Sequence, residues 1–430
     1  MSDFARLEQE LDIALAAIPL IDPHSHINPL APTARSLDDL LGYHYYTELA
    51  HSVGLAKDVL SPEVPPKETV RQVLRHLERF DNTVQYTWFL HIAREFLGFD
   101  GSRVGERDCD ALWDAAEKVF SRPDWEAEVL RRSNVEKIFL TNDFDDPLTG
   151  FDTQRYVPCL RTDDLVFHLD KPTVRSRLAE ATGIEVGDAY GLRRAIGKLF
   201  EHFVRHDARA CAISLPPRFS PMPVSSDALS SALRDPDQSA VRAMGVFWML
   251  AEFCRDFRLP FDLMIGVNRG VYQHGVYQGQ DLFDQRTSLI LYADLFNAFP
   301  DVTFCVSILN SGQSQELVAY TWIFPNVVTS GHWWYANIPA FIETDLRARL
   351  QAVPKTKQLG YYSDAYKLEF ILPKYAMYRR VLARCLARDF VVERGWSVAE
   401  AVELARLLLR DNARRIFRLD GTTGSVLVNG

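Results

Sequence analysis

The sequence lacks several features that would place it in a familiar class of protein. Its six cysteines lie far apart, with no Cys-x-x-Cys pair, and residues 1–20 lack a basic segment followed by a signal-like apolar core. Both absences favour a reducing, cytoplasmic environment over a secreted, disulfide-bonded protein. The longest apolar segments, such as residues 243–254, are too short to cross a bilayer, so no membrane role is expected.

Clustered positive charge is also missing. The chain has 48 Lys and Arg residues against 57 Asp and Glu residues, a formal net charge of −9, and it contains no Lys/Arg tract. Because phosphate binding needs clustered cations, a nucleic-acid surface is not expected. An anionic small molecule would have to be held by an individual arginine.

What the sequence does contain is a series of eight short apolar runs, each ending in polar residues. Such runs, rich in β-branched and aromatic residues, are typical of strands buried on both faces of a parallel sheet with helical crossovers. An open, doubly wound sheet is the alternative, but no Gly-x-Gly-x-x-Gly turn follows any run. The pattern predicts an α/β fold, a (β/α)8 TIM-type barrel, with residues 1–430 as a single domain. The runs are residues 18–26, 135–143, 156–163, 208–217, 260–267, 302–309, 327–334 and 359–366.

The interval between the first two runs is much longer than the others. Residues 27–134 are rich in helical pattern and too numerous for a loop, so they predict a helical insertion after the first strand. Because the insertion leaves the C-terminal end of that strand, it would lie over the barrel mouth as a lid. Near the other end of the chain, Ser397 and Glu400 have the spacing of a capping box and predict the start of a closing helix.

Two histidines end the first run, in the segment "IPLIDPHSHINP" at residues 18–29. Side chains two residues apart on a strand share a face, so His24 and His26 would point the same way. Alone, the pair could be ordinary polar residues after a strand, but Asp364 ends the eighth run, next to the first in a closed barrel. Two imidazoles and a carboxylate could hold one divalent metal ion, with Zn²⁺ favoured and Mn²⁺, Fe²⁺ or Ni²⁺ as alternatives.

Taken in order along nearly the whole chain, several short motifs resemble those of the uronate isomerases of the amidohydrolase superfamily. These enzymes interconvert D-glucuronate with D-fructuronate and D-galacturonate with D-tagaturonate. The resemblance implies a TIM barrel and a metal-dependent aldose–ketose isomerase that acts on a small-molecule sugar acid in carbohydrate metabolism. The motifs are Asp22-Pro23-His24-Ser25-His26, His44-Tyr45, "LTNDFDDP" at 140–147, Arg161 in "CLRTDD", "AISLPPRFS" at 212–220, "MIGVNRG" at 264–270, Trp333-Trp334 and "YSDA" at 362–365.

The resemblance also implies roles for individual residues. His24, His26 and Asp364 would hold the metal, and Asp364 would also take part in catalysis. Tyr45 would handle the proton of a substrate hydroxyl, and His44 would bind a hydroxyl or shuttle a proton. From sequence alone, His and Tyr in a helical stretch are ordinarily half-buried packing residues, and only their position in the family favours function.

Three further residues are candidates for binding substrate. Arg161 fits an anchor for the substrate carboxylate, because its planar fork can meet a carboxylate with two hydrogen bonds. The alternative for Arg161 is a surface ion pair with Asp163 or Asp164. Trp333 and Trp334 are either packing residues or, for at least one of them, the floor of a sugar pocket.

Two positions depart from the family pattern. The family carries an arginine two residues after the strand-eight aspartate, where this chain has Tyr366, and a small residue before the paired tryptophans, where this chain has His332. Tyr366 is therefore placed among the substrate contacts in place of a cation. His332 is a candidate for a further base or metal contact, with a hydrogen-bonded rim histidine as the alternative.

The residues by themselves leave other functions open. The His-x-His motif with Asp364 also suits a metal-dependent hydrolase, in which a metal-bound water attacks a sugar lactone, ester or amide. A catalytically inactive sugar-acid binder is a third alternative. The sequence leaves the sugar acid, the metal and the oligomeric state open, and it is compatible with a homo-oligomer.

Overall fold

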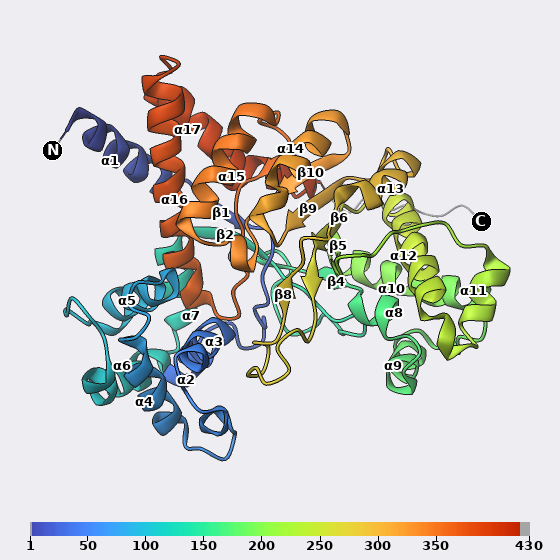
Figure 1. The fold of residues 1–430 in the computed structure, drawn as a ribbon, viewed down its shortest axis with the longest axis horizontal. Helices are drawn as coiled ribbons and strands as arrows, with labels where there is room; N and C mark the ends of the chain where they lie inside the picture. The colour runs from blue at the N-terminus through green and yellow to red at the C-terminus, as the bar shows by residue number, and fades with distance from the viewer. Residues whose placement is uncertain (1, 422–430) are drawn as a thin grey trace.

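The computed structural model describes residues 2–421 of the chain. Each of the first seven apolar runs contains at least one strand, and the eighth overlaps the last strand only at Leu359. The strands are short and most of their residues are buried, as expected for a sheet covered on both faces. Figure 1 shows them at the centre of the molecule, with helices on either side. They are β1 (Leu20–Asp22), β2 (Val135–Phe139), β3 (Tyr156–Val157), β4 (Cys159–Arg161), β5 (Ala210–Leu215), β6 (Phe261–Ile265), β9 (Phe304–Ile308), β10 (Val327–Ser330) and β11 (Gln358–Leu359).

These strands are parallel, and within each of two sheets neighbouring strands follow one another along the chain. One sheet has the order β1-β2-β3, and a second has the order β11-β10-β9-β6-β5-β4. Pro158 lies where the chain leaves the first sheet for the second, and it has no amide hydrogen to donate to a ladder. An isolated parallel bridge between Asn142 and Leu160 links the two sheets at this point.

The other junction between the two sheets lies between β11 and β1. Beyond the ends of these strands, the Asp364 amide donates to the His24 carbonyl (3.2 Å), and the His26 amide donates to the Ala365 carbonyl (2.8 Å). Within residues 2–421 the two ladders do not join into one closed sheet, so the predicted closed barrel is not confirmed. The α/β fold of parallel strands is confirmed.

The segment after β1 is helical, as its pattern predicts. Its helices α2 to α6 form a group to one side of the strands (lower left in Figure 1) and share one hydrophobic core with helix α16. The buried carboxylate of Glu369, just before α16, accepts hydrogen bonds from the Ala34 amide (3.0 Å) and the Trp125 indole (2.8 Å). The helices are α2 (Leu37–Leu41), α3 (His44–Ser52), α4 (Pro66–Leu77), α5 (Val84–Leu97), α6 (Cys109–Phe120) and α7 (Trp125–Ser133).

The remaining helices precede the first strand, connect later strands or close the chain. The predicted capping box is present at the start of α17: Ser397 Oγ accepts from the Glu400 amide (3.2 Å), and Glu400 accepts from the Ser397 amide (2.8 Å). These helices are α1 (Asp3–Ala16), α8 (Asp163–Phe167), α9 (Pro172–Thr182), α10 (Ala189–Arg205), α11 (Ser226–Ala232), α12 (Ser239–Asp256), α13 (Ala293–Ala298), α14 (Ser314–Ile323), α15 (Pro339–Ala352), α16 (Ile371–Leu386), α17 (Val398–Arg406) and α18 (Asn412–Ile416).

A small antiparallel hairpin, β7 (Val267–Asn268) with β8 (Leu282–Phe283), follows β6. The loop of this hairpin lies close against α3. Gly279 is so near Glu48 that a Cβ atom built on this glycine would lie 2.7 Å from Cγ of Glu48. The Tyr335 hydroxyl donates to the carbonyl of Asp281 in the same loop (2.7 Å). The hairpin therefore packs against the helix that begins with His44 and Tyr45.

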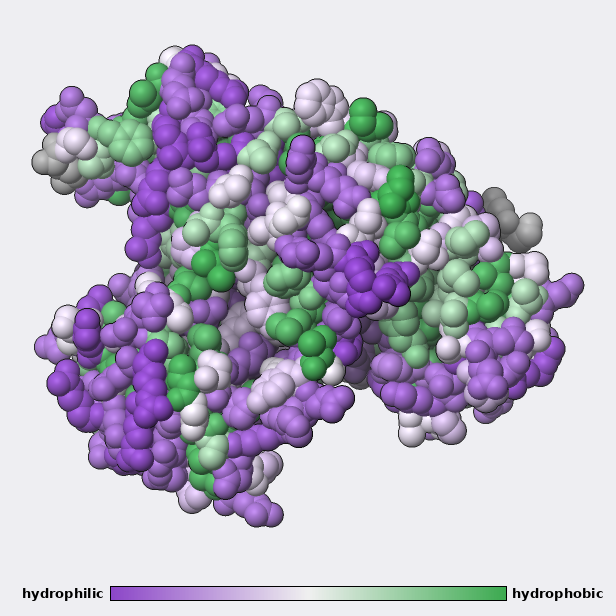
Figure 2. All heavy atoms as spheres, in the orientation of Figure 1, coloured by the Kyte–Doolittle hydropathy of each residue, from purple (hydrophilic) through white to green (hydrophobic). Residues whose placement is uncertain are grey.

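The surface and the cysteines agree with the sequence. All six cysteines are buried and have free thiols. Figure 2 shows one face of the molecule that is mostly hydrophilic, with hydrophobic side chains scattered among the polar ones. No helix in residues 2–421 is long and apolar enough to span a bilayer. The cytoplasmic location stays a prediction.

Candidate active site

His24, His26 and Asp364 come together, as the sequence predicts. Each offers one ligand atom, and these atoms all lie within 4.8 Å of one another. Asp364 Oδ1 lies 3.6 Å from His24 Nε2 and 3.3 Å from His26 Nε2. His24 and Asp364 are only 3% and 4% exposed, so the group lies inside the protein. It is a candidate metal site whose ion the geometry does not identify.

The backbone of Asp364 is held in an uncommon conformation. Its φ of 51° lies in the left-handed region, which costs a residue with a Cβ about 1–3 kcal/mol. The Asp364 amide donates to the His24 carbonyl, and the Tyr43 hydroxyl donates to the Asp364 carbonyl (2.8 Å). These contacts turn the carboxylate toward the two histidines that follow β1.

The polar atoms of this group suit a cation. Among residues 2–421, neither His24 Nε2 nor Asp364 Oδ1 has a hydrogen-bond partner, although both atoms are buried. A buried polar atom without a partner costs about 1–3 kcal/mol, and here two such atoms converge. Asp22 and Asp262 add two more buried carboxylates close to His24. The donors present therefore fit a divalent ion, which would satisfy these atoms and offset the negative charge.

Neighbouring side chains orient the two imidazoles. Asp262 Oδ2 lies 3.3 Å from His24 Nδ1, and Thr141 Oγ1 lies 2.8 Å from His26 Nδ1. Each ring then presents Nε2 to Asp364, the arrangement that outer partners impose on metal-binding histidines.

Charges around the group set its protonation. Burial lowers the pKa of His26, which favours the neutral ring that can bind a metal. Burial also lowers the pKa of His24, but the carboxylates of Asp262, Asp364 and Asp22 outweigh it, and the net pKa is raised. For Asp364, burial opposes ionisation, yet the facing His26 and His24 hold its pKa below the ordinary value. Asp364 is therefore a carboxylate.

The dipeptide His44-Tyr45 lies against this group. The Tyr45 hydroxyl donates to Asp364 Oδ2 at 3.2 Å, and burial raises the pKa of Tyr45 well above its usual range. The ring of His44 is 4.3 Å from that of Tyr45, centroid to centroid, and burial lowers the pKa of His44 to about 3. At neutral pH the phenol is protonated and the His44 ring is neutral.

Tyr366 and Arg161 lie on the more open side. The Tyr366 ring stacks on His26 with ring centroids 4.9 Å apart. Burial, with a smaller contribution from the negative charge of Asp364, raises the pKa of Tyr366 to about 12. Arg161 Nε donates to Asp163 Oδ2 at 3.2 Å, which is the ion pair that the sequence offered as the alternative to substrate binding. The guanidinium also lowers the pKa of both His26 and Tyr366, so it lies near the candidate site as well.

The segment after β10 divides between the site and the core. Trp334 lies beside the site, with its ring centroid 5.7 Å from His44, and its φ of 44° is again left-handed. Trp333 is 6% exposed and packs in an apolar cluster with Tyr362. The structure does not bring His332 to His24, His26 and Asp364: its buried ring lies 3.9 Å from Asp345 and beside Tyr378.

Sequence reasoning missed two charged residues next to this group. Asp262 lies within the apolar run of β6, which contains no other charged residue. A carboxylate buried in such a strand needs a polar partner from another strand, and here that partner is His24. Lys374 lies in α16 and is completely buried, which its position in a helical pattern with charged neighbours did not reveal.

The fold and the candidate site together define an α/β protein of parallel strands with a His-His-Asp group suited to one metal ion. No family model matches the chain. Two curated relatives are the uronate isomerases of Thermotoga maritima (21% identity over 444 residues; 93% of this chain and 94% of the relative) and Nostoc punctiforme (21% over 467 residues; 96% of each).

Solved structures give the same fold. Glucuronate isomerase from Caulobacter crescentus superposes with a TM-score of 0.88 at 19% identity, over 98% of this chain and 96% of that one. Uronate isomerase from Thermotoga maritima superposes with a TM-score of 0.85 at 20% identity, over 96% and 97%. The chain is thus similar to these uronate isomerases over nearly its whole length and shares their fold.

Proposed function

We propose that this protein is an aldose–ketose isomerase of hexuronates, interconverting D-glucuronate with D-fructuronate and D-galacturonate with D-tagaturonate, or a closely related sugar acid. The observation that carries the proposal is similarity to uronate isomerases over at least 93% of the chain, together with the His-His-Asp group that the fold brings together. On this proposal the fold is a (β/α)8 barrel, with residues 27–134 as a helical lid over its mouth.

The proposed cofactor is one divalent ion, with Zn²⁺ first and Mn²⁺, Fe²⁺ or Ni²⁺ as alternatives. Nitrogens of His24 and His26 and a carboxylate oxygen of Asp364 would hold it. When bound, such an ion polarises a carbonyl or hydroxyl oxygen of the sugar as a Lewis acid.

The protein's own residues would move the protons. Isomerisation transfers a proton between C2 and C1 through an enediol, so the site needs an acid and a base within hydrogen-bond reach. Tyr45 stays protonated and Asp364 stays ionised, and they are hydrogen-bonded to each other. Tyr45 can therefore donate a proton to one substrate atom, and Asp364 can accept a proton from the adjacent substrate atom. His44, as a neutral ring, would bind a sugar hydroxyl.

Other residues would hold the substrate. Arg161 is the proposed anchor for the carboxylate, since its guanidinium is not used up by the single contact with Asp163. Trp334 and Tyr366 would form walls of the sugar pocket beside His44 and His26. Trp333 would support Trp334 from the core. His332 is left without a catalytic role, because it lies among buried residues behind β10.

The test is direct. The purified protein, loaded with Zn²⁺ or Mn²⁺, is incubated with D-glucuronate or D-galacturonate in deuterium oxide and followed by NMR. The ketose should form, and deuterium at the carbon that gains the proton would report exchange of the enediol proton with solvent. A Tyr366→Arg variant restores the family's cation, and faster turnover by it would support the assignment of the pocket.

Hydrolysis is the second candidate, because the His-His-Asp group alone suits a metal-dependent hydrolase equally well. If neither the parent protein nor Tyr366→Arg isomerises a uronate, while both hydrolyse a sugar lactone or ester, the isomerase proposal is wrong. The family would then share the fold and the metal group without the reaction.

A further inference from the structure

A buried lysine lies behind the candidate metal site and is not used by the proposed reaction. Lys374, on helix α16, has no exposed surface. Its Nζ donates to the carbonyl of Ser363 (2.8 Å) and to the hydroxyl of Tyr43 (3.0 Å). Within residues 2–421 no carboxylate lies within 4.0 Å of the ammonium, so it is not half of a simple ion pair.

Through these two bonds Lys374 holds the backbone on both sides of Asp364. It binds the Ser363 carbonyl directly, and it binds Tyr43, whose hydroxyl donates to the Asp364 carbonyl (2.8 Å). The φ of Asp364 is left-handed, and such a conformation persists only when the surroundings over-determine it. The Lys374 ammonium supports this conformation through two hydrogen bonds, one to the Ser363 carbonyl and one to the Tyr43 hydroxyl.

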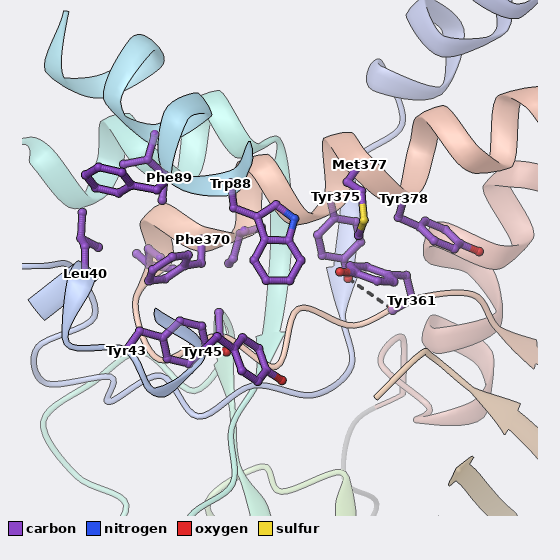
Figure 3. Packing of buried hydrophobic residues seen from close by; sticks show 14 of the residues in the cluster. Leu40, Tyr43, Tyr45, Trp88, Phe89, Tyr361, Phe370, Tyr375, Met377 and Tyr378 are labelled. Carbon is purple, nitrogen blue, oxygen red and sulfur yellow. Dashed lines mark hydrogen bonds between the residues drawn. The ribbon is translucent and has the colours of Figure 1, made fainter. Parts of the chain in front are cut away.

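The ammonium also sits among three aromatic rings. Its Nζ lies 5.0 Å from the ring centroid of Tyr43, 5.1 Å from that of Tyr45 and 4.8 Å from that of Trp88. Figure 3 shows these three side chains gathered in the core beside α16. Rings at these distances stabilise a cation. Lys374 is thus in contact with Tyr43, which holds the Asp364 backbone, and with Tyr45, which holds the Asp364 carboxylate.

Packing alone does not explain why a charged side chain is buried here. Burying an ammonium costs several kcal/mol, and a methionine would fill the same space without that cost. Burial lowers the pKa of Lys374 to about 8, while Asp364 and Asp22 raise it, so the ammonium persists at neutral pH. The groups it faces are those two carboxylates, the phenols of Tyr43 and Tyr45, and His44.

We propose that Lys374 is a positioning residue for the metal site: its ammonium fixes Asp364 in the geometry that binds the ion and keeps it hydrogen-bonded to Tyr45. The inference rests on the proposed metal ligands but not on the sugar. Outer partners of metal ligands typically change metal affinity or activity by about 10- to 100-fold when they are removed. Lys374 acts on Asp364 through the Ser363 carbonyl and the Tyr43 hydroxyl, as such an outer partner does.

The experiment measures metal affinity in the absence of sugar. Metal-free parent protein and Lys374→Met are titrated with Zn²⁺ against a chromophoric chelator, after circular dichroism and thermal unfolding have shown that the variant is folded. We expect Lys374→Met to bind Zn²⁺ about 10- to 100-fold more weakly. In turnover of a uronate, kcat should fall while KM stays within about threefold, because Arg161 and the pocket walls are untouched.

Lys357→Met is the matched control. Lys357 also donates to backbone carbonyls and burial lowers its pKa, but its acceptors are the carbonyls of Thr321 and Phe324 (2.6 Å), which are not part of the metal group. Its loss should cost stability and leave Zn²⁺ affinity unchanged. Tyr43→Phe removes the hydroxyl that links the ammonium to the Asp364 carbonyl but keeps the ammonium and its bond to the Ser363 carbonyl, so it should weaken Zn²⁺ binding by less than Lys374→Met does.

If folded Lys374→Met binds Zn²⁺ within twofold of the parent, the proposal is overturned. Should that variant not fold, Tyr43→Phe decides: weaker Zn²⁺ binding supports the proposal, and unchanged binding overturns it. Since no sugar is present, failure of the isomerase assignment would not alter either result.

Discussion

The hydroxyl of Tyr45 donates a hydrogen bond to Oδ2 of Asp364 over 3.2 Å, although the two residues are 319 positions apart in the chain. The contact joins the first long helix after β1 to the segment that follows the last strand. It leaves Asp364 Oδ1 free to face His24 and His26. One carboxylate therefore serves both the candidate metal group and the candidate proton donor.

Replacing Tyr45 tests the acid–base pair. We expect Tyr45→Phe to lower kcat by about 10²- to 10⁴-fold, because the phenol proton is lost while the ring remains. Tyr46→Phe is the control: Tyr46 is equally buried and its hydroxyl donates to the Gln85 carbonyl (2.9 Å), away from the site. It should lose about 1 kcal/mol of stability and keep its activity. Equal kcat values for the two variants in steady-state assays would remove Tyr45 from the mechanism.

Arg161 can be tested through the charge of the substrate. Arg161→Met should weaken binding of a hexuronate by about 2–5 kcal/mol, since a buried carboxylate would lose its partner, and the effect should appear mainly in KM. Binding of the uncharged aldose of the same configuration should change little. Arg177→Met is the control, because the guanidinium of Arg177 is paired with Asp145 and with Asp164 of α8. Unchanged KM in Arg161→Met would mean that another cation holds the carboxylate.

The metal group predicts a measurable metal content. Elemental analysis of protein purified without chelator should give close to one divalent ion per chain. Removal of the ion should lower Tm, because a ligand that binds only the folded state stabilises it. Asp262→Asn keeps the shape of the side chain facing His24 but removes its charge, and it should weaken metal binding about 10- to 100-fold. The assignment would be contradicted if the purified protein contained no metal and its Tm did not change when Zn²⁺ was added.

Glu48 predicts a pH dependence of stability. Burial raises its pKa from 4.5 to about 8, with Trp334 opposing and Asp281 adding to the shift. Because the folded state binds the proton more tightly than the unfolded chain, stability from this group is full below pH 4.5 and is lost as pH rises toward 8.

Glu48→Gln has nearly the same shape as the protonated glutamic acid but cannot ionise, so the variant does not lose stability as the pH rises. Its stability relative to the parent should therefore increase between pH 5 and pH 8, by about 1–3 kcal/mol after allowance for partial solvation. Thermal unfolding across that range measures the difference. A difference between Glu48→Gln and the parent that does not vary with pH across this range would refute the prediction.

Local patterns in the sequence determined a good part of this protein. The first seven apolar runs predicted the positions of parallel strands, because burial on both faces leaves a continuous apolar stretch, and the eighth run overlaps its strand only at Leu359. The spacing of His24 and His26 predicted a shared direction, and Ser397 with Glu400 predicted the start of α17. Each of these depends on neighbours only a few residues away, so the information lies within the sequence segment itself.

Contacts between distant segments were decided by the tertiary structure alone. Nothing in the run "PFDLMIGV" says that Asp262 faces His24, and nothing in α16 says that Lys374 lies behind Asp364. His332 was a candidate because it precedes the paired tryptophans, where the family has a small residue, but Gly331 has a φ of 45°, and the His332 ring packs against α15 and α16. Backbone direction at single residues and packing between elements far apart in the chain set these positions, and neither leaves a periodic signal that a sequence can display.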